Sequence, residues 1–185
     1  MKNKQLITKL FIVVAIIQLA VPLYMVWRWE DILKTGQQYT WVTAPVDPYD
    51  AFRGRYVDLR FKENSTPIVD NAIWDYGQTA YALIQKDQNG YAFISGISAL
   101  RPEGNSYVKV NVSYVENHIV HFELPFKRYY MQEELAPEAE DAYRSNVGTE
   151  ATVSIRMKNG YGVIEQLYIG NQTIYDYLRN KQEQE

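Results

Sequence analysis

LFIVVAIIQLAVPLYMVW, which runs from Leu10 to Trp27, is an apolar stretch without a charged residue, interrupted only by Gln18 and Pro22. At about 1.5 Å of rise per residue, a helix over this run and its flanks covers the roughly 30 Å hydrocarbon layer of a bilayer. The sequence therefore predicts one membrane-spanning helix. It also predicts that the rest of the chain is a domain tethered to the lipid bilayer.

Three interpretations of this run compete: an uncleaved anchor, a cleaved signal peptide and a buried helix of a soluble protein. A signal peptide has a shorter apolar core, followed by small residues at the cleavage site. Here the run leads into Tyr24, Trp27 and Trp29, whose amphipathic rings favour the headgroup level of a membrane. We therefore expect an uncleaved anchor, with the other two interpretations kept as alternatives.

The charges that flank the run predict its orientation. Three lysines precede it, whereas the basic residues that follow stand beside Glu30 and Asp31. The positive-inside rule then places the N-terminus in the cytoplasm. We expect a single-pass protein of the cell membrane with a cytoplasmic tip and anchor over residues 1–35, an extracytoplasmic β-rich domain over 36–178 and a flexible tail over 179–185.

The composition argues against several chemistries. The chain has no cysteine, which excludes disulfides, thiolate catalysis and zinc–thiolate sites, and its net charge of −3 does not indicate a nucleic acid partner. The two histidines, His118 and His121, are predicted on opposite faces of one strand, where they cannot share a metal. No G-x-S-x-G motif occurs, and residues 30–56 contain no serine for a signal-peptidase mechanism. We therefore predict no catalytic residue, no metal and no cofactor.

Beyond residue 36 the chain alternates between apolar and polar residues over short stretches, as β-strands do. Asn-Gly pairs at 89–90 and 159–160 supply the positive φ that tight hairpins need. The predicted strands cover residues 38–43, 56–62, 79–86, 91–99, 106–115, 119–124, 151–157 and 161–169.

Start and stop signals predict short helices between these strands. Thr66 and Pro67 resemble a helix cap followed by a proline at the first position, which predicts a helix or turn up to Trp74. Pro137 starts a second helix up to Asn146, and residues 173–178 form a third short segment. The fold class is therefore mainly β (a β-rich α+β chain). We expect an N-terminal transmembrane helix followed by one antiparallel β-sandwich or barrel-like domain with two or three short helices.

Two segments taken together resemble a known family. Residues 47–61, DPYDAFRGRYVDLRF, are similar to the signature of the GDYXXLXY family of bacterial membrane-anchored proteins, and Gly54, Tyr56 and Leu59 stand at its motif positions. Arg55 replaces the acidic residue of the motif, and Phe61 stands at its last aromatic position. Residues 124–130, LPFKRYY, resemble the family's later block, so that the resemblance covers residues 44–178.

The resemblance implies a location and a class of partner. The family has no established activity, and its members often accompany multi-span membrane proteins. Read from the residues alone, Gly54 is a structural corner where the backbone turns into a strand, or the charges around it form a polar surface beside the tether. The candidate interaction surface consists of Arg53, Gly54, Arg55, Tyr56, Asp58, Arg60, Lys127, Arg128 and Tyr129.

Two functions therefore compete. The preferred one is a non-catalytic extracytoplasmic module that serves a multi-span membrane protein as an accessory or binding partner. The alternative is an envelope hydrolase, or a small-ligand or glycan-binding domain, with a polar pocket around Tyr56, Asp58 and Arg60 that is also walled by Arg128 and Tyr129. The first predicts a flat or edge surface, whereas the second predicts a concave site with convergent charges.

Overall fold

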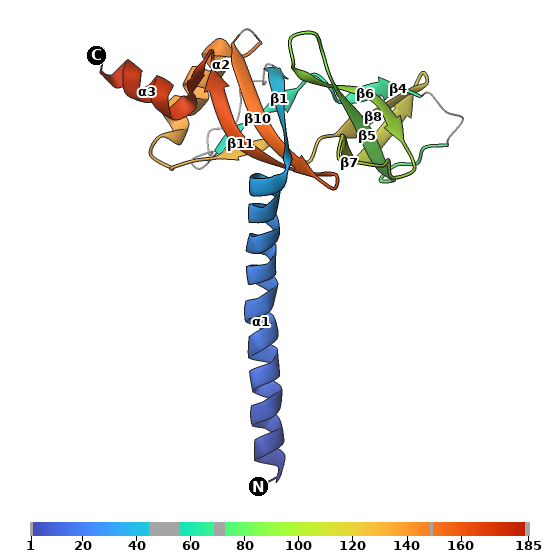
Figure 1. Ribbon diagram of the computed structural model, residues 1–185, viewed down its shortest axis with the longest axis vertical. Helices are drawn as coiled ribbons and strands as arrows, with labels where there is room; N and C mark the ends of the chain where they lie inside the picture. Colours follow the sequence, from blue (N-terminus) through green and yellow to red (C-terminus); the bar gives the residue numbers. More distant parts are fainter. Residues whose placement is uncertain (1, 45–55, 69–72, 149, 184–185) are drawn as a thin grey trace.

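A long helix carries a β-rich head at its C-terminal end (Figure 1). The computed structural model describes residues 2–44, 56–68, 73–148 and 150–183 of the 185-residue chain. The helix, α1 (Lys2–Thr35), is long and apolar enough to cross a membrane, and the side chains of its apolar stretch are exposed. The apolar helix that the sequence predicts is therefore present, and it continues through residues 30–35 as expected.

The first sheet of the head is antiparallel and has the strand order β12-β11-β10-β1-β3. Its strands are β1 (Gln37–Ala44), β3 (Arg60–Phe61), β10 (Ala151–Lys158), β11 (Tyr161–Ile169) and β12 (Gln172–Thr173). Trp41 of β1 is fully buried, with its ring 5.5 Å from that of Phe126 and 6.2 Å from that of Phe61. The core of the head is therefore built around the strand that directly follows α1.

The second sheet is also antiparallel and has the order β4-β8-β7-β5-β6. Its strands are β4 (Ser65–Pro67), β5 (Thr79–Lys86), β6 (Ala92–Ser98), β7 (Tyr107–Glu116) and β8 (Ile119–Glu123). Its two edge strands, β4 and β6, contact each other, so the sheet curls into a nearly closed barrel. This confirms the predicted barrel-like architecture. The predicted hairpins β5–β6, β7–β8 and β10–β11 are present as well.

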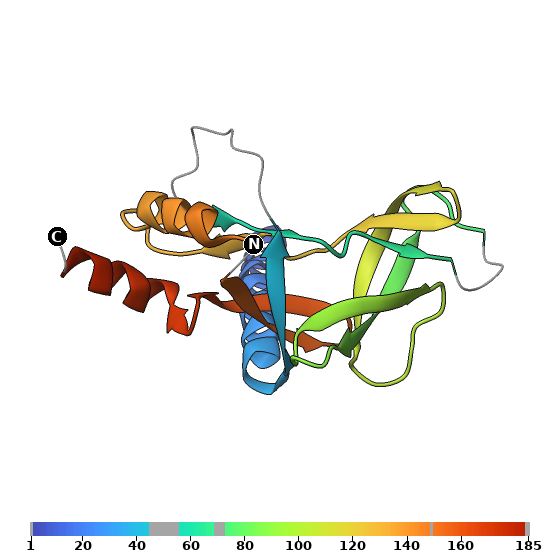
Figure 2. The ribbon, with the colours of Figure 1, turned by 90° about the horizontal axis from the view of Figure 1, so that it is seen from above.

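Two short helices lie at the end of the head away from the barrel (Figures 1 and 2). They are α2 (Ala136–Asn146) and α3 (Ile174–Gln182). Gly148 follows α2 with φ of +82°, and the Thr173 hydroxyl accepts a hydrogen bond from the Asp176 N–H at 3.2 Å at the start of α3. α3 continues to Gln182, into the residues that were expected to form a tail.

Two expectations about the segment after the anchor are wrong. Residues 56–62 do not form one strand, because β2 (Tyr56–Asp58) pairs with β9 (Arg128–Tyr130) whereas β3 pairs with β1. Thr66 and Pro67 do not start a helix but belong to β4, where Thr66 is buried opposite Val120. A proline is tolerated there because β4 is an edge strand and its missing N–H breaks no ladder.

α1 passes into the first sheet through Gly36 alone. The Gly36 N–H donates to the Ile32 carbonyl at 2.8 Å and so ends the helix. A Cβ at this position would lie 2.4 Å from the Ile32 oxygen and 3.1 Å from the Met157 backbone. Glycine is therefore required here by the close approach of the backbone.

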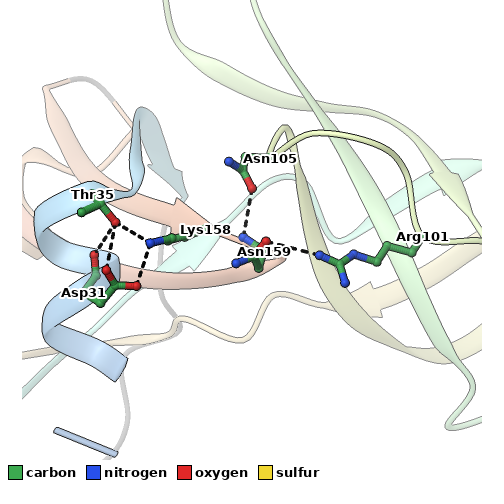
Figure 3. Close-up of polar contacts among 6 residues, drawn as sticks. All are labelled: Asp31, Thr35, Arg101, Asn105, Lys158 and Asn159. Carbon is green, nitrogen blue, oxygen red and sulfur yellow. Dashed lines mark hydrogen bonds and ion pairs between the residues drawn. The ribbon is translucent and has the colours of Figure 1, made fainter. Parts of the chain in front are cut away.

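The turn between β10 and β11 braces the last turns of α1. The Lys158 ammonium lies 2.7 Å from the Asp31 carboxylate and donates to the Thr35 hydroxyl at 2.7 Å (Figure 3). The Arg28 guanidinium lies 4.0 Å from the centre of the Tyr161 ring. The helix therefore cannot swivel relative to the first sheet without breaking these contacts.

The same turn also holds the barrel. The Asn159 N–H donates to the Asn105 side-chain oxygen at 3.2 Å, and Arg101 donates to the Asn159 side-chain oxygen at 3.3 Å (Figure 3). The Lys109 N–H donates to the Gly160 carbonyl at 2.9 Å. One hairpin turn thus joins the helix, the first sheet and the barrel.

Gly36→Ala should lower the free energy of unfolding of the full-length protein in detergent by about 2–4 kcal/mol, because the new methyl group meets backbone atoms that cannot move aside. Thermal unfolding followed by tryptophan fluorescence measures this effect. Gly96→Ala is the matched control, since its Cβ would meet only Leu83 Cδ1 at 3.8 Å. Equal losses in the two variants would contradict the role given to Gly36.

Candidate functional site

Pairing of β2 with β9 brings the two predicted surface segments together. Tyr56 lies opposite Tyr130, Val57 opposite Tyr129, and Asp58 opposite Arg128. The Leu59 N–H donates to the Lys127 carbonyl at 2.7 Å, which extends the ladder by one more bond. Two segments that are far apart in the sequence therefore place their side chains next to each other on one pair of strands.

The outward face of this ladder carries aromatic rings around a cation. We call Tyr56, Asp58, Arg128 and Tyr130 the ledge. The Arg128 guanidinium lies 4.7 Å from the centre of the Tyr56 ring, and the Tyr56 and Tyr130 rings meet edge to face at 5.7 Å. A hydrogen bond with the Tyr130 hydroxyl, together with the nearby Tyr56 and Asp58, raises the pKa of Arg128. The ledge thus holds the Arg128 guanidinium over the Tyr56 ring and close to the Asp58 carboxylate.

Tyr129 is nearly buried, unlike the exposed Tyr130 that follows it. It is only 6% exposed and points inward beside Val57, because neighbouring residues of a strand face opposite sides. Burial raises the pKa of its hydroxyl to about 12, while Gln166 and Tyr175 lie within hydrogen-bonding reach. Its ring therefore supports the ledge from behind.

The other predicted surface residues lie beside the ledge or outside the described part of the chain. Arg53, Gly54 and Arg55 lie outside the described residues. Lys127 is exposed and forms an ion pair with Glu123 at 2.6 Å. Arg60 is exposed on β3 and lines the same recess as Asp58 and Lys127. Of the predicted surface residues that the structure describes, Tyr56, Asp58 and Arg128 belong to the ledge, and Arg60 and Lys127 flank it.

The ledge borders an open recess between α1 and the head, which we call the stem groove. It has a volume of about 1320 Å³. Trp29 of α1 forms one wall, while Lys109 of β7, Gly162 of β11 and the ledge residues Arg128 and Tyr130 form the others. This recess faces the side of the head from which the helix leaves.

A second open recess, the barrel groove, lies beside β8 and has a volume of about 460 Å³. Charged side chains converge on it, as the ligand-binding interpretation predicts. They are Asp58, Arg60, Glu63, Glu123 and Lys127. Asp58 borders both grooves, so the ledge lies between them.

The histidines are arranged differently from each other. His118 lies in the β7–β8 turn with φ of +62°, whereas the His121 ring stacks on Tyr114 with 4.1 Å between ring centres. Among the side chains that the structure describes, no group of three His, Cys, Asp or Glu residues could hold a metal ion.

Glu63 is a half-buried acid in the barrel groove. Its Oε2 atom is buried and has no hydrogen-bond partner among the described residues, and burial raises the pKa of the carboxyl group above its ordinary value of 4.5. Since the folded protein holds this proton more tightly than the unfolded chain, ionisation of Glu63 at higher pH destabilises the fold.

Glu63→Gln should therefore raise the Tm at pH 8 by about 2 °C, the shift that somewhat less than 1 kcal/mol produces in a chain of this size. The difference from the parent should shrink as the pH falls towards 4.5, because the parent carboxyl becomes neutral as well. Thermal unfolding across this pH range measures both effects. Glu116→Gln, at an exposed strand end, is the control. A constant difference at all pH values would contradict burial as the cause.

Sequence reasoning missed the stem groove. The sequence predicts Trp29 only at the membrane interface and Lys109 only on the polar face of a strand. The two are brought together because Val108 of β7 bridges to Gly160 in the β10–β11 turn, next to the end of α1. No local pattern in either segment signals this contact.

A family model described as GDYXXLXY protein matches residues 18–167 of the chain. Neither the curated proteins nor the solved structures contain a match.

Proposed function

We propose that this chain, which belongs to the GDYXXLXY family, is anchored in a membrane by α1 and binds a multi-span membrane protein as a non-catalytic module. The stem groove is the observation that carries the proposal. It opens between the candidate membrane-spanning helix and the head, with walls from both. A binding surface in this position suits a partner that lies in the same membrane.

The height of the head above the bilayer supports this choice of partner. The uncharged run ends at Trp27, and Thr35 lies only about 12 Å further along the helix axis. Because Arg28 and Asp31 already contact the β10–β11 turn, the head rests at the level of the lipid headgroups. A head held so close to the membrane reaches partners embedded in it more readily than distant ones.

The chemistry of the ledge suits protein recognition. Tyrosine and arginine are enriched among the residues that carry most of the binding energy in protein interfaces. Tyr130 is 66% exposed, and its ring is fixed on a strand ladder, so little conformational entropy is lost on binding. The ledge and the stem groove share Arg128 and Tyr130 and so form one surface.

We also propose that the N-terminus is cytoplasmic and that the head lies outside the cytoplasm, as an uncleaved signal anchor would leave it. The lysines before the run and the acidic residues after it support this orientation. The head would then meet the extracytoplasmic loops of its partner.

The anchor predicts that the full-length protein stays in the membrane pellet after carbonate extraction. The double substitution Val14→Lys and Ile17→Lys should release it, because each charge at the centre of a span costs about 2.5–3.5 kcal/mol. Val14→Leu with Ile17→Leu is the matched control and should remain in the pellet. Release of the parent protein by carbonate would contradict membrane anchoring.

The partner surface predicts a position-dependent crosslink. A photoreactive residue in place of Tyr130 should form an adduct with an integral membrane protein in native membranes, and Arg128→Glu should reduce its yield at least about tenfold, as loss of a residue central to binding does. The same photoreactive residue at Leu100, 80% exposed in the loop before β7, is the control. Equal adducts at both positions, or recovery of the protein alone and monodisperse after mild solubilisation, would contradict the proposal.

The barrel groove favours the second candidate, binding of a small polar ligand or glycan. Its convergent charges satisfy one requirement of such a site. Lys127 and Glu123 already neutralise each other there, however, and the recess is open. The stem groove therefore remains the better supported surface.

A further inference from the structure

We propose that Gln18 forms hydrogen bonds to a polar side chain on a transmembrane helix of the multi-span partner, and that this helix packs along one face of α1 and ends beneath the head. The inference rests on the proposed function and extends it into the bilayer. It follows from the position of Gln18, from Pro22 one turn later, and from the alignment of both with the stem groove.

Gln18 lies at the centre of the uncharged run, with eight residues before it and nine after it. It is therefore roughly 12–14 Å of helix rise from either end, near the midplane of a bilayer. The side chain is exposed, and the strands that contact α1, β10 and β11, pack only on its last turns (Figure 1). An amide left unpaired in hydrocarbon is costly, so polar residues at this depth face another helix or a water-filled cavity.

Pro22 adds a second polar group at the same place. Proline has no N–H, so the residue four positions earlier loses the helical hydrogen bond to its carbonyl. That residue is Gln18. Backbone groups freed by proline inside a membrane are satisfied by neighbouring helices or by polar side chains and water. Gln18 thus presents an amide donor, an amide acceptor and a backbone carbonyl within one turn.

These groups point along a continuous face that leads to the stem groove. At 100° per residue, Pro22, Met25 and Trp29 all lie within about 40° of Gln18 around the helix axis. Trp29 is the residue through which α1 forms a wall of the stem groove. A helix packed on the Gln18 face would therefore run directly towards the recess under the head.

The same geometry argues against a second copy of this chain as the occupant. Lys109, Arg128 and Gly162 of the head form the opposite walls of the groove, so the head overhangs this face of α1. Packed helices lie 8–10 Å apart. A parallel copy at that distance would place its own head in the same space. A helix that ends at the membrane surface and turns into a short loop, as in a multi-span protein, fits beneath the overhang.

Photocrosslinking along α1 in native membranes tests this inference with the full-length chain. Photoreactive residues at Phe11 and Met25, on the Gln18 face, should form adducts, whereas the same residues at Ile16 and Leu23, on the far face, should not. Mass spectrometry should map the adducts to a membrane-spanning segment of a multi-span protein with an amide, hydroxyl or imidazole side chain at mid-depth. Gln18→Leu should reduce the adduct yield by about threefold to tenfold, and Gln18→Asn should retain it.

Three results would overturn the inference: equal adducts around the whole helix, adducts with a second copy of the chain, or a yield that Gln18→Leu leaves unchanged. Since leucine favours insertion more than glutamine does, loss of the anchor does not explain a reduced yield. The photoreactive residue at Tyr130 separates this inference from the proposed function. A Tyr130 adduct without adducts on α1 would refute the helix contact alone, and absence of both would refute the partner role as well.

Discussion

Direct passage of α1 into β1 through Gly36 is the constraint on which the rest of the structure depends. β1 is an inner strand of the first sheet, paired with β10 on one side and, at its end, with β3 on the other. Its Trp41 lies at the middle of the aromatic core. The direction in which the helix leaves the head is therefore fixed by a strand of the first sheet that contributes Trp41 to the core, rather than by a flexible linker.

The β10–β11 turn fixes both α1 and the barrel to the first sheet. Lys158 holds the helix, Asn159 contacts the loop before β7, and Gly160 accepts a hydrogen bond from β7 itself. A Cβ at Gly160 would lie 2.7 Å from the Tyr107 ring, so the approach of the barrel is as close as the backbone allows. The walls of the stem groove, which come from α1, β7, β9 and β11, thereby keep fixed positions relative to one another.

Features with a local cause could be predicted from the sequence. The apolar run predicts α1, and alternation together with Asn-Gly pairs predicts the hairpins, because these signals act between neighbouring residues. The break after Asp58 could not be predicted, since it arises when the chain changes partner from β9 to β1. The helix predicted after Thr66 and Pro67 is absent for a related reason. The local sequence resembles a helix cap, but the segment pairs with β8, which is distant in the sequence.

The candidate site, like the fold, could be predicted only where its cause is local. Both segments of the ledge were identified from their residues, but which tyrosine faces outward depends on the register between β2 and β9. That register places Tyr129 inside and Tyr130 outside. The stem groove depends on contacts between elements that are distant in the sequence, so it becomes visible only in the folded chain.

Because the contacts with Lys158 and Tyr161 hold α1 against the first sheet, the head moves together with the helix. Helices tilt when the local hydrocarbon thickness does not match their apolar length. Because Lys158 and Tyr161 hold the end of α1, such a tilt would swing the elongated head as one body, lowering the barrel towards the lipid on one side or lifting it on the other (Figures 1 and 2). If α1 spans a bilayer, as we propose, such a tilt would therefore change the height of the ledge above the lipid.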